Sequence, residues 1–202
     1  DYLIVPAVHH SDDKDLISWI RQQAAKGATV VGICDGVLLL GNAGLLKNRR
    51  ATGHWYSQSE RESDFPDTHW LKNVRYVVDG PVITTSGVTA ALPASLALVS
   101  AIAGPQRAEE LATEYGVTDW SARHDSDVFG LGAGGYLTAA GNLLAFWNHQ
   151  QLGIAVAADF DEMAIALQAD AYSRTFRSTA SLLGAHGKPM RKPFNGLARS
   201  IV

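Results

Sequence analysis

Residues 28–36 read Ala-Thr-Val-Val-Gly-Ile-Cys-Asp-Gly, and their centre is Cys34, the only cysteine of the chain. A β-branched apolar run typical of a strand ends in Gly-x-Cys-x-Gly, and Val-Leu-Leu-Leu follows in a helical pattern. This order is typical of a nucleophile elbow, a tight strand-to-helix turn whose glycines avoid a collision of Cβ atoms. Because backbone N–H groups at a helix start favour a thiolate, we expect a reactive Cys34 with a lowered pKa. The alternative is a buried apolar cysteine whose flanking glycines serve packing alone.

A strand–helix–strand unit is predicted to lead into this turn. The apolar run at 1–6 has no polar face and predicts a buried strand, and Asp12 or Asp13 is a suitable cap for a helix that ends near Gly27. A strand at 29–33 follows, so parallel pairing is the simplest arrangement. Since the carboxyl ends of parallel strands meet at one edge, the loop with His9 and His10 should lie beside Cys34.

The rest of the chain predicts further elements in order. Up to residue 104 these are a helix to Asn42, a short strand at 50–52, a helical turn at 58–62, a β-hairpin of 74–78 and 82–85, and a helix at 88–103. Beyond it we expect helices at 106–115, 136–149 and 161–176 and a strand at 152–157, and we assign no structure from 183 onward. The predicted fold is therefore α/β, with a flavodoxin-like, mostly parallel sheet flanked by helices over residues 1–104 and a mainly helical extension over residues 105–202.

The composition is that of a folded globular chain. Of 202 residues, 47% are hydrophobic and 18% charged, and the formal net charge is −3. This charge offers no basic surface for nucleic acid or an anionic membrane, and no apolar run approaches the ~20 residues of a spanning helix. A single cysteine cannot form an intramolecular disulfide and suits a reducing compartment. We therefore expect a cytoplasmic protein without nucleic-acid or membrane partners.

Three segments carry a family resemblance in combination. They read Gly-Ile-Cys-Asp-Gly at 32–36, Asn-Ala-Gly-Leu-Leu-Lys-Asn-Arg-Arg-Ala-Thr-Gly-His-Trp at 42–55, and Val-Asp-Gly-Pro-Val-Ile-Thr-Thr-Ser-Gly-Val-Thr-Ala at 78–90. Together they resemble the ThiJ/PfpI family, a branch of the class I glutamine-amidotransferase-like superfamily, and look closest to isonitrile hydratases and members fused to AraC regulators. The resemblance covers roughly residues 1–104 and implies that Cys34 lies in the elbow with His54 beside it.

The chain departs from the family pattern in three places. The family usually begins with an earlier strand and helix that bear an acidic residue bonded to the active cysteine, and this sequence starts after that point. Ala7 and Val8 stand where the family often has two glycines that help to form an oxyanion site. Asp35 follows the cysteine, and its carboxylate should oppose ionisation of the neighbouring thiol.

The resemblance and the residues together predict a covalent mechanism. The Cys34 thiolate would attack an electrophilic carbon of a carbonyl, thioester, isonitrile or aldehyde, and His54 would act as general base or proton shuttle. The backbone N–H of Asp35, next to Gly36, is the expected oxyanion donor. The alternatives are a redox-sensitive thiol without turnover and, for His54, a core histidine bonded to the backbone.

Other polar residues are weaker candidates. Thr85, Ser86 and Gly87 end a strand near the same edge and are expected to line the pocket, although ordinary turn residues would look the same. His9 or His10 is expected to contact substrate. We expect no metal there, because adjacent residues seldom point the same way. For the same reason a triad of Cys34 with His124 and Asp125 is a minor alternative. The Gly130–Gly135 loop lacks a phosphate-binding context.

Two functional classes lead from the sequence, and a structural role in which the C-terminal half supplies a dimer interface is a third possibility. The first class is a cysteine-dependent hydrolase, hydratase or glyoxalase-like enzyme that acts on a small molecule, needs no cofactor and forms a homodimer. Trp120, Phe146 and Trp147 suit a core or a dimer interface. The second is a ligand- or redox-sensing regulatory domain, since residues 164–177 faintly resemble a helix-turn-helix. Residues 104–202 argue against DNA binding, because eight Lys/Arg stand against ten Asp/Glu.

Overall fold

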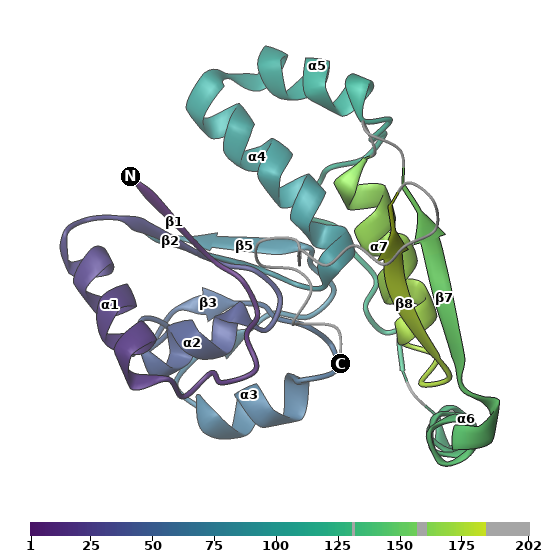
Figure 1. Cartoon of the computed structure of the whole chain (residues 1–202). Coiled ribbons are helices and arrows are strands. Elements are labelled where there is room, and N and C mark those ends of the chain that lie inside the picture. Colours follow the sequence, from purple (N-terminus) through teal and green to yellow (C-terminus); the bar gives the residue numbers. More distant parts are fainter. Residues whose placement is uncertain (131, 157–160, 185–202) are drawn as a thin grey trace. The chain divides into compact units, whose positions relative to one another are not determined.

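The computed structural model describes residues 1–130, 132–156 and 161–184. The chain forms two compact units, Asp1–Gly130 and Leu131–Val202, and each is described by itself (Figure 1). The first unit therefore extends beyond residue 104, where we placed the end of the family-like domain, because α5 (Pro105–Glu114) packs on α4 (Ala91–Ala103). The domain division at 104 stays a prediction.

A four-stranded sheet forms the centre of the first unit, in the order β1-β2-β6-β5. Its strands are β1 (Tyr2–Val5), β2 (Thr29–Gly32), β6 (Val82–Thr85) and β5 (Tyr76–Asp79). The strands β1, β2 and β6 are parallel, with Val5 opposite Gly32 and Gly32 opposite Thr84, and β5 pairs antiparallel with β6. The predicted parallel unit and the predicted hairpin are both confirmed.

The helix α1 (Lys14–Ala25) connects β1 to β2 and begins as the sequence predicts. The Asp13 carboxylate accepts hydrogen bonds from the backbone N–H groups of Asp15 and Leu16, both at 3.0 Å, which satisfies two donors of the first turn. Beyond its last residue Gly27 has φ +92°, a left-handed conformation that glycine adopts without strain. The cap and the stop are therefore set by local sequence.

The elbow helix α2 (Gly36–Asn42) lies in the hydrophobic core. Its Val37, Leu39 and Leu40 are fully buried and pack with residues of β1, α1 and β2. Removing this apolar area from water is the main force that holds α2 on the sheet. Arg21 of α1 fixes the far end, since its guanidinium donates to the carbonyls of Asn42 at 2.7 Å and Ala43 at 2.9 Å.

The segment that follows α2 brings His54 to the sheet. The strand β3 (Arg50–Ala51) pairs in parallel with β4 (His69–Trp70), a two-residue strand that the sequence pattern did not predict. The Arg50 N–H donates to Asp79 Oδ2 at 2.8 Å, and this bond is the main reason why the Asp79 pKa is lowered. The Thr52 N–H donates to the buried Thr84 Oγ1 at 2.9 Å. These bonds fix the two ends of β3, the strand that leads to His54.

Two predictions about burial are wrong. The strand at 1–6 was expected to be buried, yet Tyr2 and Ile4 are 47% and 58% exposed because β1 pairs with β2 alone among the described strands. We expect the polar helical turn at 58–62 to be exposed, and Ser59, Glu60 and Glu62 of α3 (Gln58–Asp64) are exposed. The prediction is wrong at Arg61, which is only 3% exposed. In both places tertiary packing, and not local pattern, decides burial.

The second unit contains helices and a parallel pair of strands. Its helices are α6 (Ala133–Leu144), the short η2 (Phe146–Asn148) and α7 (Glu162–Ser173). The strands β7 (Gln150–Ala155) and β8 (Ser178–Leu183) pair in parallel across α7, and β8 was not predicted. The segment 164–177 that resembled a helix-turn-helix therefore forms most of α7 and the turn before β8. From residue 185 onward, the segment to which we assigned no structure lies outside the described residues.

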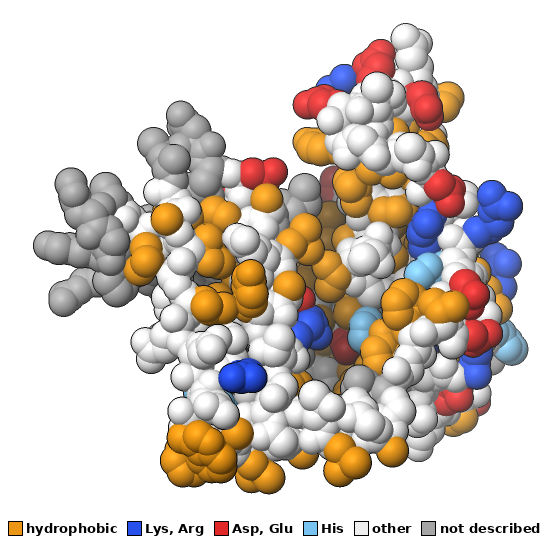
Figure 2. Space-filling model, turned by 90° about the vertical axis from the view of Figure 1, so that its right-hand side faces the viewer, with side chains coloured by type: hydrophobic (Ala, Val, Ile, Leu, Met, Phe, Trp, Pro, Cys, Tyr) orange, Lys and Arg blue, Asp and Glu red, His pale blue; other side chains and the backbone are white. Residues whose placement is uncertain are grey.

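Exposed hydrophobic side chains are frequent on the described surface of this unit. Figure 2 shows orange side chains in several groups, and the large exposed ones of α6 and η2 are Tyr136, Leu137, Leu143, Leu144, Phe146 and Trp147. The aromatic residues Phe146 and Trp147 are therefore surface residues in this chain and do not form its core. Of the helices in the described ranges, none has the length and apolar character needed to cross a membrane.

Candidate active site

The turn between β2 and α2 holds Cys34 in a conformation that non-glycine residues rarely adopt. Its φ is +56°, in the left-handed region. Such a backbone is strained by about 1–3 kcal/mol and persists where surrounding contacts fix it, often at functional sites. The predicted tight turn from strand to helix, with Cys34 at its centre, is present.

Gly36 explains why the elbow requires a glycine. A Cβ atom at this position would collide with the carbonyl oxygen of Val5 and would lie 2.9 Å from the carbonyl carbon of Pro6. The end of β1 therefore passes directly against the first turn of α2. At Gly32 a Cβ would lie 3.0 Å from Leu40 Cδ2, so the strand and the helix are also closely packed at the other flank.

The buried Thr85 at the end of β6 holds the elbow from the neighbouring strand. The Cys34 N–H donates to Thr85 Oγ1 at 3.1 Å, and Thr85 is fully buried. Ser86 is buried as well, and its N–H donates to the Arg75 carbonyl. Within the described residues the N–H of Asp35 has no hydrogen-bond acceptor, so it is available to a bound oxygen atom.

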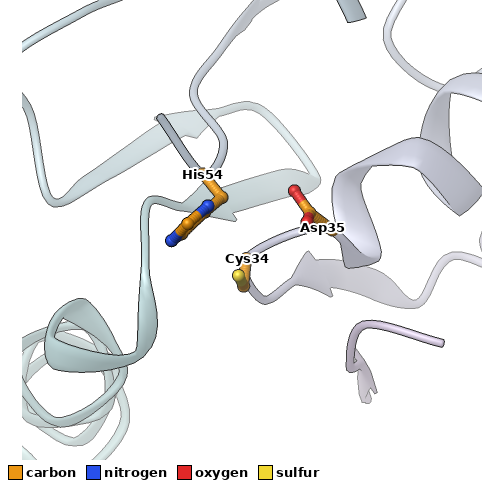
Figure 3. A group of neighbouring side chains, drawn as sticks. All are labelled: Cys34, Asp35 and His54. Carbon is orange, nitrogen blue, oxygen red and sulfur yellow. The ribbon is translucent and has the colours of Figure 1, made fainter. Parts of the chain in front are cut away.

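His54 lies beside Cys34 and Asp35. One ligand atom from each residue, namely Cys34 Sγ, an Asp35 carboxylate oxygen and a ring nitrogen of His54, lies within 4.8 Å of the other two (Figure 3). A hydrogen bond orients the imidazole ring, since its Nδ1 accepts from the Tyr56 N–H at 3.3 Å. The ring also lies close to Gly87, where an added Cβ would be only 3.1 Å from His54 Cδ2.

Ser57 and Arg61 support these residues from α3, and neither was singled out from the sequence. The Ser57 hydroxyl donates to Asp35 Oδ1 at 2.6 Å. Arg61 Nη1 donates to Ser57 Oγ at 3.1 Å and to the carbonyl oxygen of His54. Ser57 and Arg61 are four residues apart on one helical turn, but nothing in the polar segment 57–64 marks that turn as buried.

Burial changes the electrostatics of Arg61. Removal from water lowers its pKa, and the negative charges of Asp35, Glu62 and a Cys34 thiolate oppose that shift, Asp35 most strongly. The guanidinium also lies 5.1 Å from the ring centroid of Trp70, a cation–π distance. Since arginine stays protonated in proteins, a buried positive charge lies next to the Cys34–Asp35–His54 group.

The spacing of this group also suits a metal ion in principle, because a thiolate, a carboxylate and an imidazole are ligands of Zn²⁺. The hydrogen bonds favour a different use. His54 Nδ1 accepts from a backbone N–H and Asp35 accepts from Ser57, so both groups already have protein partners. A neighbouring buried arginine also opposes a cation. These partners and this charge do not favour a metal ion among the three side chains.

The remaining predicted candidates lie in different surroundings. His9 and His10 are exposed in the loop after β1, and no described interaction joins them to Cys34 or His54. The ring centroid of His124 lies 5.6 Å from that of Phe129 in a stacked arrangement, and the backbone N–H of His124 donates to the Asn73 carbonyl. Of the predicted edge residues, Thr85 bonds to the elbow through the Cys34 N–H, and Gly87 lies close to the His54 ring.

Comparison with known proteins identifies the family of this region. Residues 5–101 match the DJ-1/PfpI family, which confirms the resemblance read from the sequence. An isonitrile hydratase from Pseudomonas putida is 36% identical over 108 residues, which are 52% of this chain and 45% of that protein. The HTH-type transcriptional regulator CdhR from Pseudomonas aeruginosa is 34% identical over 100 residues, 50% of this chain and 30% of that protein. The chain thus spans less than half the length of these relatives.

Solved structures agree on the fold. The DJ-1beta protein of Drosophila melanogaster has a TM-score of 0.51 at 18% identity, over 58% of this chain and 64% of its own. An AraC family transcriptional regulator from Pseudomonas putida has a TM-score of 0.51 at 20% identity, over 57% and 63%. The predicted α/β fold is confirmed. Because regulators occur among the relatives, our expectation of no nucleic-acid partner conflicts with the family and is withdrawn.

Proposed function

Because residues 5–101 are a DJ-1/PfpI family region, we propose that this chain carries a cysteine-dependent active site for a small electrophilic substrate, with Cys34 as nucleophile. The observation that supports this most directly is the meeting of Cys34, Asp35 and His54, whose ligand atoms lie within 4.8 Å of one another at a strained elbow. Such convergence of a nucleophile and a base is what covalent catalysis requires.

Each group has a defined part in the proposed reaction. The Cys34 thiolate attacks an electrophilic carbon, a sulfur–carbon bond forms, and an electron pair moves onto the attached oxygen or nitrogen. The Asp35 N–H, which has no acceptor within the described residues, donates to that atom. His54 takes the thiol proton as the thiolate forms, and it gives that proton to the leaving group of a carbonyl compound or thioester, or to the former isonitrile carbon. Water activated by His54 then adds to the sulfur-bound carbon, the carbon–sulfur bond breaks, and the Cys34 thiolate is regenerated with release of the product.

The substrate class follows from this chemistry. Carbonyl compounds, thioesters, aldehydes and isonitriles all present a carbon that a thiolate attacks. The similarity to an isonitrile hydratase favours isonitriles as the first compounds to assay. The lone thiol suits a reducing compartment, so we place the protein in the cytoplasm.

A turnover screen with matched variants tests this function. We expect hydrolysis or hydration of at least one substrate by the unmodified chain and loss of activity, by 100-fold or more, in Cys34→Ser and His54→Gln. His124→Gln is the control, because that ring stacks on Phe129. An activity that survives Cys34→Ser unchanged would exclude covalent catalysis.

A second candidate function is ligand or redox sensing without turnover, and the similarity to HTH-type regulators favours it. In this case Cys34 would bind or react with a small molecule but release no product. Specific retention of DNA by the chain in a gel shift at moderate salt, together with a negative turnover screen, would place sensing first.

We also propose that the chain forms a homodimer through its C-terminal half. The exposed apolar side chains of α6 and η2 form a surface that water disfavours. Sedimentation of the unmodified chain and of Phe146→Ser/Trp147→Ser tests this, since the double variant should shift toward monomer. A monomeric unmodified chain at micromolar concentration would exclude the proposal.

A further inference from the structure

Arg61 is a buried charged residue that the proposed reaction does not use. It is 3% exposed, and it donates to the carbonyl of His54 and to Ser57 Oγ, whose hydroxyl in turn donates to Asp35 Oδ1. One guanidinium thereby connects to both residues that flank Cys34 in space. Burying a cation is unfavourable unless nearby charge and hydrogen bonds compensate it, so this placement requires a reason.

The surroundings are shaped to admit the arginine. A Cβ at Gly53 would lie 3.1 Å from Arg61 Nε and 3.2 Å from its Cδ, so glycine leaves the space that the side chain occupies. Trp70 covers the guanidinium at 5.1 Å. The Nε atom has no hydrogen-bond partner among the described residues. Hydrogen bonding of the guanidinium is therefore incomplete and does not by itself account for the burial of this side chain.

The charge of Asp35 supplies the reason. A carboxylate next to a thiol disfavours the thiolate, because two like charges at close range repel each other. The charged groups that face Arg61 are Asp35 and Cys34 from the elbow and Glu62 from its own helix. A positive charge at this place therefore offsets Asp35 in the field that Cys34 experiences.

We propose that Arg61 is a positioning residue that holds Asp35 and His54 in place and neutralises the Asp35 charge, so that the Cys34 thiolate forms near neutral pH. This inference rests on the proposed function, since it concerns the reactivity of the same cysteine. It differs from a purely structural role in one respect. Once Asp35 is removed, the Cys34 thiol should no longer require the Arg61 charge to ionise. Packing that is lost when Arg61 is replaced would not be restored by removal of Asp35.

A double-mutant cycle on thiol reactivity tests this difference. Cys34 is the only cysteine, so its alkylation by iodoacetamide is measured as a function of pH in unmodified chain, Arg61→Met, Asp35→Asn and the double variant. We expect Arg61→Met to raise the midpoint of alkylation by about one pH unit, which slows the reaction about tenfold at a pH well below both midpoints. The double variant should react within about twofold of the unmodified chain, because the two opposite charges are removed together. Arg107→Met, which removes an exposed arginine paired with Glu110, is the matched control and should change nothing.

The outcomes separate this inference from the proposed function. If the unmodified chain has a lowered alkylation midpoint and Arg61→Met leaves it unchanged, the role of Arg61 is overturned but Cys34 stays the proposed nucleophile. The same holds if the double variant reacts as slowly as Arg61→Met. A midpoint like that of free cysteine in the unmodified chain overturns both. If Arg61→Met does not fold, Asp35→Asn alone decides, because loss of that carboxylate with Arg61 retained should accelerate alkylation at pH 7 at least threefold. An unchanged rate would contradict the inference.

Discussion

The backbone N–H of Cys34 donates a hydrogen bond to Thr85 Oγ1 over 3.1 Å, and this bond joins the elbow to the end of the neighbouring strand. The preceding residue, Thr84, accepts in the same way from the Thr52 N–H at 2.9 Å. Because successive side chains of a strand point to opposite faces, these two threonines support two different loops from one strand end. One loop carries the cysteine and the other leads to His54.

We predict that Thr85→Val, which keeps the shape but removes the acceptor, destabilises the fold by about 1 kcal/mol or more, because the part-buried Cys34 N–H loses its partner. Urea unfolding measures this change. Thr113→Val is the control, since that exposed threonine bonds only to the Glu109 carbonyl of its own helix. Equal stability of the two variants would show that the bond to Cys34 contributes nothing.

Gly36→Ala should be far more damaging than its small size suggests. The added methyl would meet the carbonyl of Val5 and the carbonyl carbon of Pro6, both backbone atoms that cannot move aside. We expect a loss of at least about 2 kcal/mol, or failure to fold. At Gly134 in α6 the same methyl meets nothing, so Gly134→Ala should be neutral or stabilising by up to about 1 kcal/mol. Thermal unfolding of both variants gives the comparison.

Gly87→Ala is predicted to disturb the site without unfolding the chain. Its methyl would lie 3.1 Å from His54 Cδ2, so the imidazole ring must shift by a few tenths of an ångström or more. The expected result is a near-native melting temperature with a changed pH profile of Cys34 alkylation, because the base has moved. An unchanged profile would mean that His54 does not act on Cys34.

The Asp119 carboxyl predicts a pH dependence of stability. Hydrogen bonds from Ser121 and an ion pair with Arg75 lower its pKa from 3.8 to about 2. A lowered pKa in the folded chain means that its contribution is fully present above the unfolded pKa and is lost as the pH falls from about 4 to 2. Asp119→Asn should therefore be less stable than the unmodified chain at pH 7. The two should converge near pH 2 in urea unfolding, and a constant difference would contradict this prediction.

Much of the first unit was predictable because its signals are local. The Asp13 cap, the stop at Gly27 and the apolar run before Cys34 act within a few residues, and the structure shows each of them. The position of His54 near Cys34 was predicted through the family resemblance, and the structure brings the two together.

The missed features depend on contacts between distant segments. Arg61 lies in a polar segment, and its burial results from the space left by Gly53 and the cover of Trp70. The exposure of Tyr2 and Ile4 depends on which strands flank β1. The strand β8 was missed because its partner β7 lies far away in the sequence, on the other side of α7. Local patterns carry no information on such neighbours.

The pH dependence of Cys34 alkylation tests the central claim most directly. Because the chain has one cysteine, the rate of iodoacetamide labelling reports its thiolate fraction alone. An activated nucleophile predicts a midpoint at least one unit below the ~8.5 of free cysteine. A midpoint at or above that of free cysteine, measured on folded chain, would contradict the proposed active site.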